Sequence, residues 1–63
     1  MKLGQRVKIL GGMKEFVGRT GTISDFEKGM KMYRVSLDIP VNIPHVGIVQ
    51  DDLWEKQYLK AIK

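Results

Sequence analysis

The stretch GQRVKILGGMKEFVGRTGTI, residues 4–23, decides the fold that we expect of this chain. Over residues 5–10, polar and apolar residues alternate, with Val7 and Ile9 on one side. Alternation with a period of two and β-branched residues on one face is typical of a half-buried strand. Beyond the glycine-rich loop, Arg19–Phe26 predicts a second strand, and a glycine inside it marks a bulge, a bend or the close approach of another backbone. The stretch therefore predicts two strands joined by a loop.

Three further short strands are expected at Lys31–Leu37, Val46–Gln50 and Tyr58–Ile62. Each is a short run of mostly apolar or alternating residues bounded by turn-forming residues. A hairpin turn at residues 27–30 joins the second and third strands, with Gly29 as the residue best suited to a left-handed conformation. The chain thus has five expected strands.

The segments between the later strands carry their own signals. Residues 38–45 contain two prolines, which cannot sit in a central strand, so we expect an extended excursion there. Residues 51–54 predict one helical turn, because Asp51 can cap the amides that follow it. A helical tail over residues 52–63 remains open as an alternative to a turn followed by a strand.

These elements define one small domain that spans residues 1–63. No segment has a helical pattern of apolar residues long enough for a helical fold. Without cysteines, the fold has no disulfide to stabilise it and must rest on strand packing. The expected class is all-β, a small five-stranded and partly open barrel with a short helical turn before the last strand.

The first two strands resemble a known motif. The pattern GxxVxIxxG at residues 4–12, followed by FVGxxGxI at residues 16–23, resembles the KOW motif. The loop between the two halves is longer here than in the usual motif. The resemblance covers residues 4–26 and implies an SH3-like barrel of the kind found in ribosomal proteins and NusG-type transcription factors. Barrels of this kind bind RNA, DNA, peptides or no ligand, so the resemblance implies the fold and leaves the partner open.

Two weaker resemblances concern other SH3-like barrels. The run Gly4–Val7 is similar to the opening strand of the type II dihydrofolate reductases, which act as tetramers. Their Val-Gln-Ile-Tyr run is matched here only by its first two residues, at 49–50. Tudor-like barrels hold a methylated lysine in an aromatic cage with an acidic residue. The candidates for such a cage are Phe16, Phe26, Tyr33, Trp54 and Tyr58, with Asp51 or Asp52 as the acid.

The whole chain has a net charge of +4, and the positive charge is concentrated in its first half. Residues 1–34 contain eight basic and three acidic residues, whereas residues 35–63 contain three basic and four acidic ones. A positive surface suits the phosphates of nucleic acid or an acidic protein, and an exposed aromatic residue can stack on a base. The residues expected at the binding face are Arg6, Lys8, Lys14, Phe16, Arg19 and Arg34.

A protein–protein adaptor is the alternative function, such as a small phage or mobile-element regulator with an acidic partner. Flexible methionines beside positive charge suit an adaptable contact surface. Such a tip is expected at the hairpin and consists of Lys28, Met30, Lys31 and Met32. Phe16 has a structural alternative as well, because it can fold back as a lid on the open end of the barrel.

Several kinds of chemistry have no support in the sequence. A P-loop needs a lysine and a hydroxyl residue that lead into a helix, whereas strand residues follow Gly18. The lone His45 and the absence of cysteine leave no metal-ligand spacing, and the adjacent Asp51 and Asp52 do not form an acid–base pair across a cleft. We therefore expect no enzyme and no cofactor, with the reductase as a remote alternative.

The location of the protein is a further expectation. No apolar run reaches the length of a signal peptide or of a membrane span. We expect a cytoplasmic protein without a membrane partner, whose oligomeric state remains open.

Overall fold

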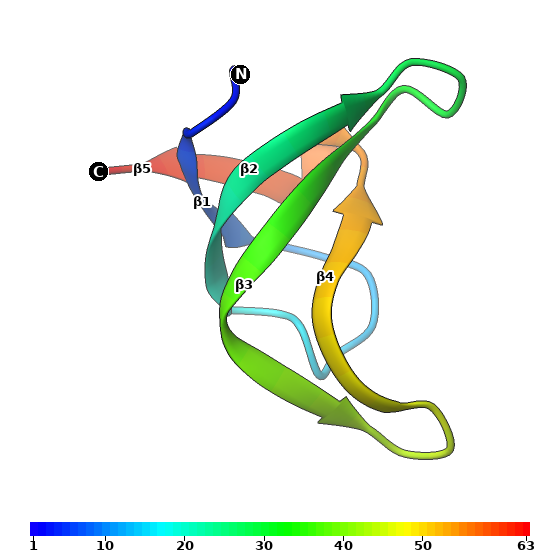
Figure 1. Ribbon diagram of the computed structural model, residues 1–63. Helices are drawn as coiled ribbons and strands as arrows, with labels where there is room; N and C mark the ends of the chain where they lie inside the picture. Colours follow the sequence, from blue (N-terminus) through cyan, green and yellow to red (C-terminus); the bar gives the residue numbers. More distant parts are fainter.

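Five antiparallel strands form one sheet in the computed structural model, which describes residues 1–63. Along the sheet the strands follow the order β4-β3-β2-β1-β5, so the last strand returns beside the first (Figure 1). The elements are β1 (Arg6–Ile9), β2 (Thr20–Glu27), β3 (Met32–Ile43), β4 (Gly47–Trp54), the 3₁₀ turn η1 (Lys56–Tyr58) and β5 (Leu59–Ile62).

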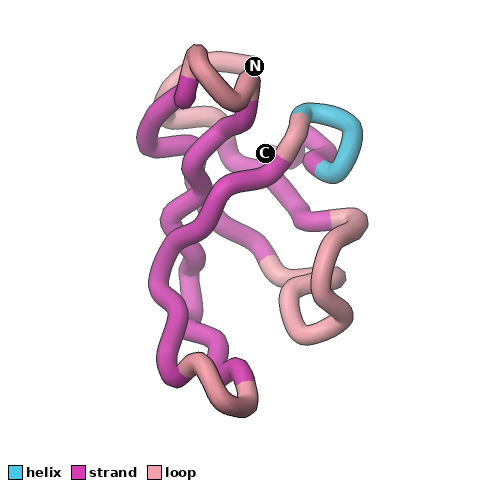
Figure 2. The backbone as a smooth tube through the Cα atoms, turned by 90° about the vertical axis from the view of Figure 1, so that its right-hand side faces the viewer, coloured by secondary structure: helices cyan, strands magenta, loops and turns pink.

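The sheet curls into a partly open barrel. In Figure 1, β2 and β3 run across the front, while β1 and β5 lie behind them. In the view turned by 90°, the long strands occupy one side, and η1 and a large loop lie on the other (Figure 2). The expected class is thereby confirmed: all-β, with five strands and a short helical turn before the last one.

The core consists of ten buried apolar side chains from all five strands and the β1–β2 loop. Val7, Ile9, Ile23 and Val35 are the most completely buried, each at 1% exposure or less. Full burial of such a side chain contributes about 1.5–3 kcal/mol. The other six members are Phe16, Leu37, Val41, Ile43, Trp54 and Leu59.

Gly21 of β2 lies between β1 and β3. It pairs with Val7 of β1 on one side and with Leu37 of β3 on the other. A Cβ at this position would clash with the carbonyl oxygen of Ser36 and would lie 2.7 Å from Cγ1 of Val35. Of the roles that a glycine inside a strand can have, the close approach of another backbone is the one found here.

The β1–β2 loop closes on Gly18, which has φ of +88°. The Gly18 N–H donates to the carbonyl of Ile9 at 2.9 Å, and the Ile9 N–H donates to the carbonyl of Arg19 at 2.9 Å. Two residues thus face one, with glycine in the left-handed position, which is the geometry of a glycine bulge. Gly18 is the point at which the chain turns into β2.

The expectation for residues 38–45 was wrong, because β3 continues through Pro40 to Ile43. Pro40 falls in the stretch where the pairing partner jumps, from Ser36 opposite Asp51 to Val41 opposite Val49. No ladder hydrogen bond is needed at this irregularity, so the missing N–H of proline costs nothing there.

The expected helical turn at residues 51–54 and the helical tail over residues 52–63 are also contradicted. Residues 51–54 are the end of β4, paired in register with residues 33–36 of β3. The helical turn comes later, at η1, where the preceding Glu55 makes no side-chain cap. Pairing with β3 and the burial of Trp54 outweigh the local capping preference of Asp51, which instead accepts a hydrogen bond from Arg34.

The hairpin between β2 and β3 differs from expectation in one residue. Lys31, with φ of 55°, takes the left-handed conformation that Gly29 was expected to take. Glu27 pairs with Met32, which leaves a loop of residues 28–31 between the strands. The Lys31 N–H donates to the carbonyl of Lys28 at 3.3 Å, and Gly29 lies inside this turn without a left-handed conformation.

Candidate functional site

Arg6, on the outer face of β1, is held by side chains of neighbouring strands. Its two terminal nitrogens donate to the two carboxylate oxygens of Asp38, each at 2.6 Å. Nη1 also donates to Oγ1 of Thr22 at 3.0 Å, and Oγ1 of Thr20 donates to Asp38 at 2.6 Å. The hydrogen bond from Arg6, followed by that from Thr20, lowers the pKa of Asp38 to about 2. The same bond to Asp38 raises the pKa of Arg6, so both groups stay ionised and paired.

Lys8 lies two positions further along the same face of β1, and no carboxylate is paired with it. It stands directly opposite Lys60 of β5 on one side and Thr20 of β2 on the other. Both lysines are exposed, and neither takes part in an ion pair, since the two salt bridges of the chain belong to Arg6 and Arg34. Two uncompensated positive charges therefore lie side by side.

Arg34 belongs to another part of the sheet and is also paired. Its Nη1 donates to Oδ1 of Asp51 on the neighbouring strand β4 at 3.0 Å. The pair is open to solvent, with side-chain exposures of 42% and 53%. Of the three arginines of the chain, only Arg19 has no carboxylate partner.

Phe16 is buried at 3% exposure and does not present its ring to solvent. Its ring packs edge-on against Trp54, with centroids 5.2 Å apart and an interplanar angle of 84°. Two roles were considered for Phe16, stacking on a base and covering the open end of the barrel. The structure shows the second, since Phe16 joins the core from the β1–β2 loop.

Lys14 and Arg19, on either side of Phe16 in the loop, are exposed and form no ion pair. Arg19 Nε makes a single long hydrogen bond, 3.5 Å to the carbonyl of Glu15. Together with Asp38, Arg19 also lines a hollow of about 170 Å³. Both residues thus keep their charge free for a partner.

The expected hairpin tip is divided by the structure. Lys28, Met30 and Lys31 are exposed in the turn, with Met30 at 55%. Met32 is half-buried and lines a cavity with residues of the β1–β2 loop and β4. The rings of Phe26 and Tyr33 pack against each other near the turn, with centroids 4.8 Å apart.

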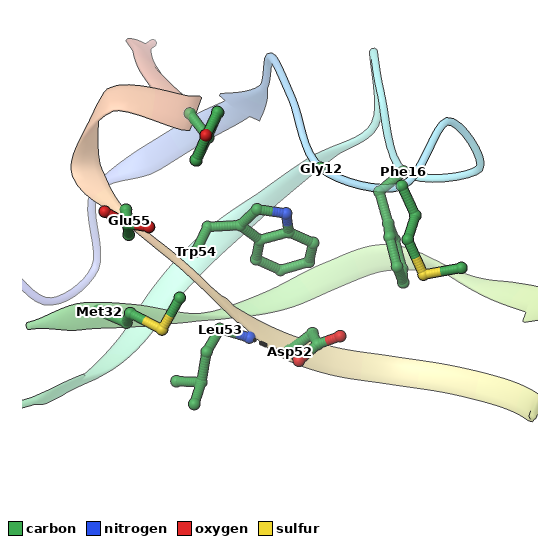
Figure 3. A pocket seen from close by; sticks show the side chains of 9 residues that line it. Gly12, Phe16, Met32, Asp52, Leu53, Trp54 and Glu55 are labelled. Atoms are coloured by element: carbon green, nitrogen blue, oxygen red, sulfur yellow. Dashed lines mark hydrogen bonds between the residues drawn. The ribbon is translucent and has the colours of Figure 1, made fainter. Parts of the chain in front are cut away.

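A cavity of about 230 Å³ lies between the β1–β2 loop and the end of β4 (Figure 3). Three of the five aromatic residues considered for a cage line it, whereas Phe26 and Tyr33 do not. Asp52 lines it as well, while Asp51 is paired with Arg34 outside it. The lining residues are Gly12, Met13, Phe16, Met32, Asp52, Leu53, Trp54, Glu55 and Tyr58.

Sequence reasoning did not find Met13, Leu53 or Glu55, which complete this cavity. These residues meet only because the loop folds over the end of β4, and no periodic pattern in the sequence records that contact. The paired glycines at 11–12 were the available signal, since they let the loop pass close to the aromatic rings.

No group of three or more histidine, cysteine, aspartate or glutamate side chains is placed to hold a metal ion. The chain has no helix with the length and apolar character that crossing a membrane demands. Comparison of the chain with protein-family models, with curated proteins and with solved structures found no match in any of the three.

Proposed function

We propose that the chain is a non-enzymatic cytoplasmic module that binds RNA or DNA through a basic surface, within a ribosomal or transcription complex. The surface is centred on Lys8 and Lys60, and the free cations Lys14 and Arg19 contribute to it. The observation that carries the proposal is the uncompensated pair of Lys8 and Lys60 on adjacent strands.

Like charges directly opposite each other in a sheet destabilise the folded chain. This chain keeps such a pair at Lys8 and Lys60, although Asp38 lies close enough to neutralise Arg6 on the same face. Phosphates relieve the repulsion when they bind, and the counterions they release drive association. The net charge of +4 also attracts a polyanion before contact.

The remaining expected residues indicate how the surface binds. Arg6 and Arg34 already neutralise carboxylates of the chain, so they are not the main phosphate contacts. Phe16 is buried and is therefore not positioned to stack on a base. Contacts to phosphate without contacts to bases favour binding that is sensitive to salt and indifferent to sequence.

The experiment is a titration of fluorescein-labelled RNA, single-stranded DNA and duplex DNA of about 20 nucleotides, followed by anisotropy between ~50 and ~200 mM salt. We expect the logarithm of affinity to fall linearly with the logarithm of salt concentration. Lys8→Ala and Lys60→Ala should each reduce the slope by about one, because each removes one phosphate contact. Lys28→Ala, in the hairpin turn outside the surface, removes the same charge and should leave the slope unchanged.

Absence of binding to all three probes at ~50 mM salt contradicts the proposal. Polyglutamate serves as the second ligand in the same assay. Binding to polyglutamate alone, with the same losses in Lys8→Ala and Lys60→Ala, identifies an acidic protein as the partner of this surface.

A further inference from the structure

The cavity at the end of β4 shares no lining residue with the basic surface, and most of its lining is hydrophobic. The walls come from three parts of the chain that are distant in sequence: the β1–β2 loop, the start of β3, and the end of β4 with the adjoining η1. A volume of about 230 Å³ is below the roughly 300–1,000 Å³ of sites for drug-sized ligands. It exceeds the roughly 150 Å³ cavity that admits benzene, so it suits one large apolar side chain.

Two glycines keep this cavity open and close to the rings. Gly12 has φ of +95°, and a Cβ there would lie 3.2 Å from Nε1 of Trp54. A Cβ at Gly11 would lie 2.5 Å from the ring of Tyr58, so this ring packs directly on the backbone. A side chain at Gly12 would fill the space beside the indole, and one at Gly11 would displace the ring of Tyr58.

The indole N–H of Trp54 is a donor without an acceptor in the chain. None of the side-chain hydrogen bonds uses it, whereas Trp54 as a whole is 5% exposed. No buried polar side-chain atom lacks a partner, so the indole nitrogen must reach solvent. Figure 3 shows this nitrogen on the side of the ring toward Gly12. An incoming carbonyl oxygen can accept this hydrogen bond.

The cavity also carries negative charge, in contrast to the chain as a whole. Asp52 and Glu55 line it, are exposed and take part in no ion pair. Asp52 accepts only the N–H of the following Leu53, at 2.8 Å. Two free carboxylates repel the phosphates of a nucleic acid and attract a cation. A ligand that complements this cavity is therefore apolar at one point and positively charged beside it.

We propose that this cavity binds a short basic segment of a partner protein. One large apolar side chain of the segment enters the cavity and packs against the walls that Phe16, Trp54 and Tyr58 form. Its backbone carbonyl accepts the indole N–H of Trp54, and a neighbouring lysine or arginine pairs with Asp52 and Glu55. The chain then has two faces of opposite charge, one for a polyanion and one for a basic protein segment.

The test follows the single tryptophan indole in ¹⁵N-labelled protein, which gives one ¹H–¹⁵N cross-peak for that N–H. The probes are five-residue peptides in which leucine, isoleucine, methionine or phenylalanine stands between lysine and arginine. At least one should shift the indole peak with increasing concentration. Its counterpart with serine at the centre should bind about tenfold more weakly, because the apolar contact is lost. Its counterpart with both cations replaced by glutamate should not shift the peak.

Variants of the two carboxylates test the charged half of the proposal. Asp52→Asn and Glu55→Gln should each weaken the best peptide by about two- to fivefold, as expected for exposed charge pairs. Asp25→Asn is the matched control, since Asp25 is also exposed and also accepts the N–H of the following residue at 2.8 Å. It should leave the peptide affinity unchanged.

Three results would overturn the proposal. The first is an indole peak that none of the four peptides moves at ~2 mM, a concentration that detects binding as weak as the millimolar range. The second is equal binding of the glutamate peptide, or equal losses in Asp52→Asn and Asp25→Asn. The third is a shift of the same peak by the RNA or DNA probes, which would make the cavity part of the nucleic-acid surface. The double variant Lys8→Ala, Lys60→Ala should bind the peptide normally, so failure of one proposal does not decide the other.

Discussion

Arg6 and Lys8 lie on the same face of β1, two positions apart, and their surroundings are opposite. Arg6 meets the carboxylate of Asp38 with two hydrogen bonds of 2.6 Å. Lys8 meets another lysine, Lys60, and no acid. Whether a basic residue in this sheet is paired within the fold or free to bind a partner therefore depends on the residues that the neighbouring strands place beside it. Its own position in the alternating pattern does not determine this.

The β1–β2 loop contains the same contrast between a residue held by the chain and one left free. Phe16 packs into the core, whereas Lys14, two positions earlier, is exposed and unpaired. In both regions one residue serves the fold and a close neighbour remains for a partner. Substitutions that separate stability from binding test this division.

The largest effect is expected for Phe16→Ala, which should lower the free energy of unfolding by about 3–5 kcal/mol through loss of a buried ring. Lys14→Ala should change it by no more than about 0.5 kcal/mol. Urea unfolding followed by the fluorescence of Trp54 measures both, because this residue is buried in the folded chain and becomes exposed when the chain unfolds. Phe16→Leu, which keeps apolar volume, provides folded protein for binding assays and should bind nucleic acid as the parent does. A Phe16→Leu variant that unfolds normally but binds RNA poorly would place Phe16 at the interface.

The next effect is expected for Lys8→Glu, where stability and binding should move in opposite directions. The new carboxylate faces Lys60 across the strands, and an opposite-charge pair in this position stabilises by about 0.2–1 kcal/mol. Affinity for the RNA probe at ~50 mM salt should fall by about tenfold or more, because a phosphate contact becomes a repulsion. Urea unfolding and anisotropy on the same sample give the two values. A simultaneous loss of stability and affinity would mean that Lys8 supports the fold.

Asp38→Asn should remove the charged partner of Arg6, so that Arg6, like Lys8, has no carboxylate paired with it. The pKa of Asp38 is lower in the folded chain, at about 2, than the ordinary value near 3.9. Ionised Asp38 therefore stabilises the fold above about pH 4, and this contribution is lost as the pH falls toward about 2. The melting temperature of the parent should exceed that of the variant above pH 4, and the difference should disappear near pH 2.

The same variant has a second readout in binding. With Arg6 released, the salt dependence of nucleic-acid affinity should steepen by about one contact. An unchanged slope would show that Arg6 cannot reach the phosphates even when it is free.

Local pattern was sufficient for most of the strands and for the class of the fold. The alternation around Val7 and Ile9 predicted β1. The glycine inside the second strand indicated a bulge, a bend or a close approach, and the structure has the close approach at Gly21. The local pattern gave the wrong structure where pairing with a distant strand determines the conformation. At Asp51 it predicted a helix cap, whereas the residue belongs to β4 and is paired with β3. Local sequence signals do not record which residues become cross-strand neighbours.

The candidate site was predictable only in part for the same reason. Charge distribution indicated a basic surface, but Asp38 is 32 positions from Arg6 in sequence and neutralises it through the fold. The pair of Lys8 and Lys60 likewise joins the first strand to the last. The cavity beside Trp54 depends on a loop that folds over β4, so its acidic residues, Asp52 and Glu55, gave no signal as a pair.

The smallest effect is expected for Arg34→Gln, which tests whether every paired arginine is structural to the same degree. Arg34 makes one hydrogen bond to Asp51, at 3.0 Å, and both side chains are about half exposed, whereas Arg6 makes two shorter bonds. Exposed single pairs contribute about 0–1 kcal/mol, so the free energy of unfolding should change by less than about 0.5 kcal/mol. A double-mutant cycle of Arg34→Gln with Asp51→Asn in urea isolates the coupling between the two side chains. A coupling above about 1 kcal/mol would show that solvent exposure does not weaken this pair. Arg34 would then stabilise the fold through its carboxylate partner as Arg6 does. The contrast between paired arginines and unpaired lysines would extend across the whole sheet.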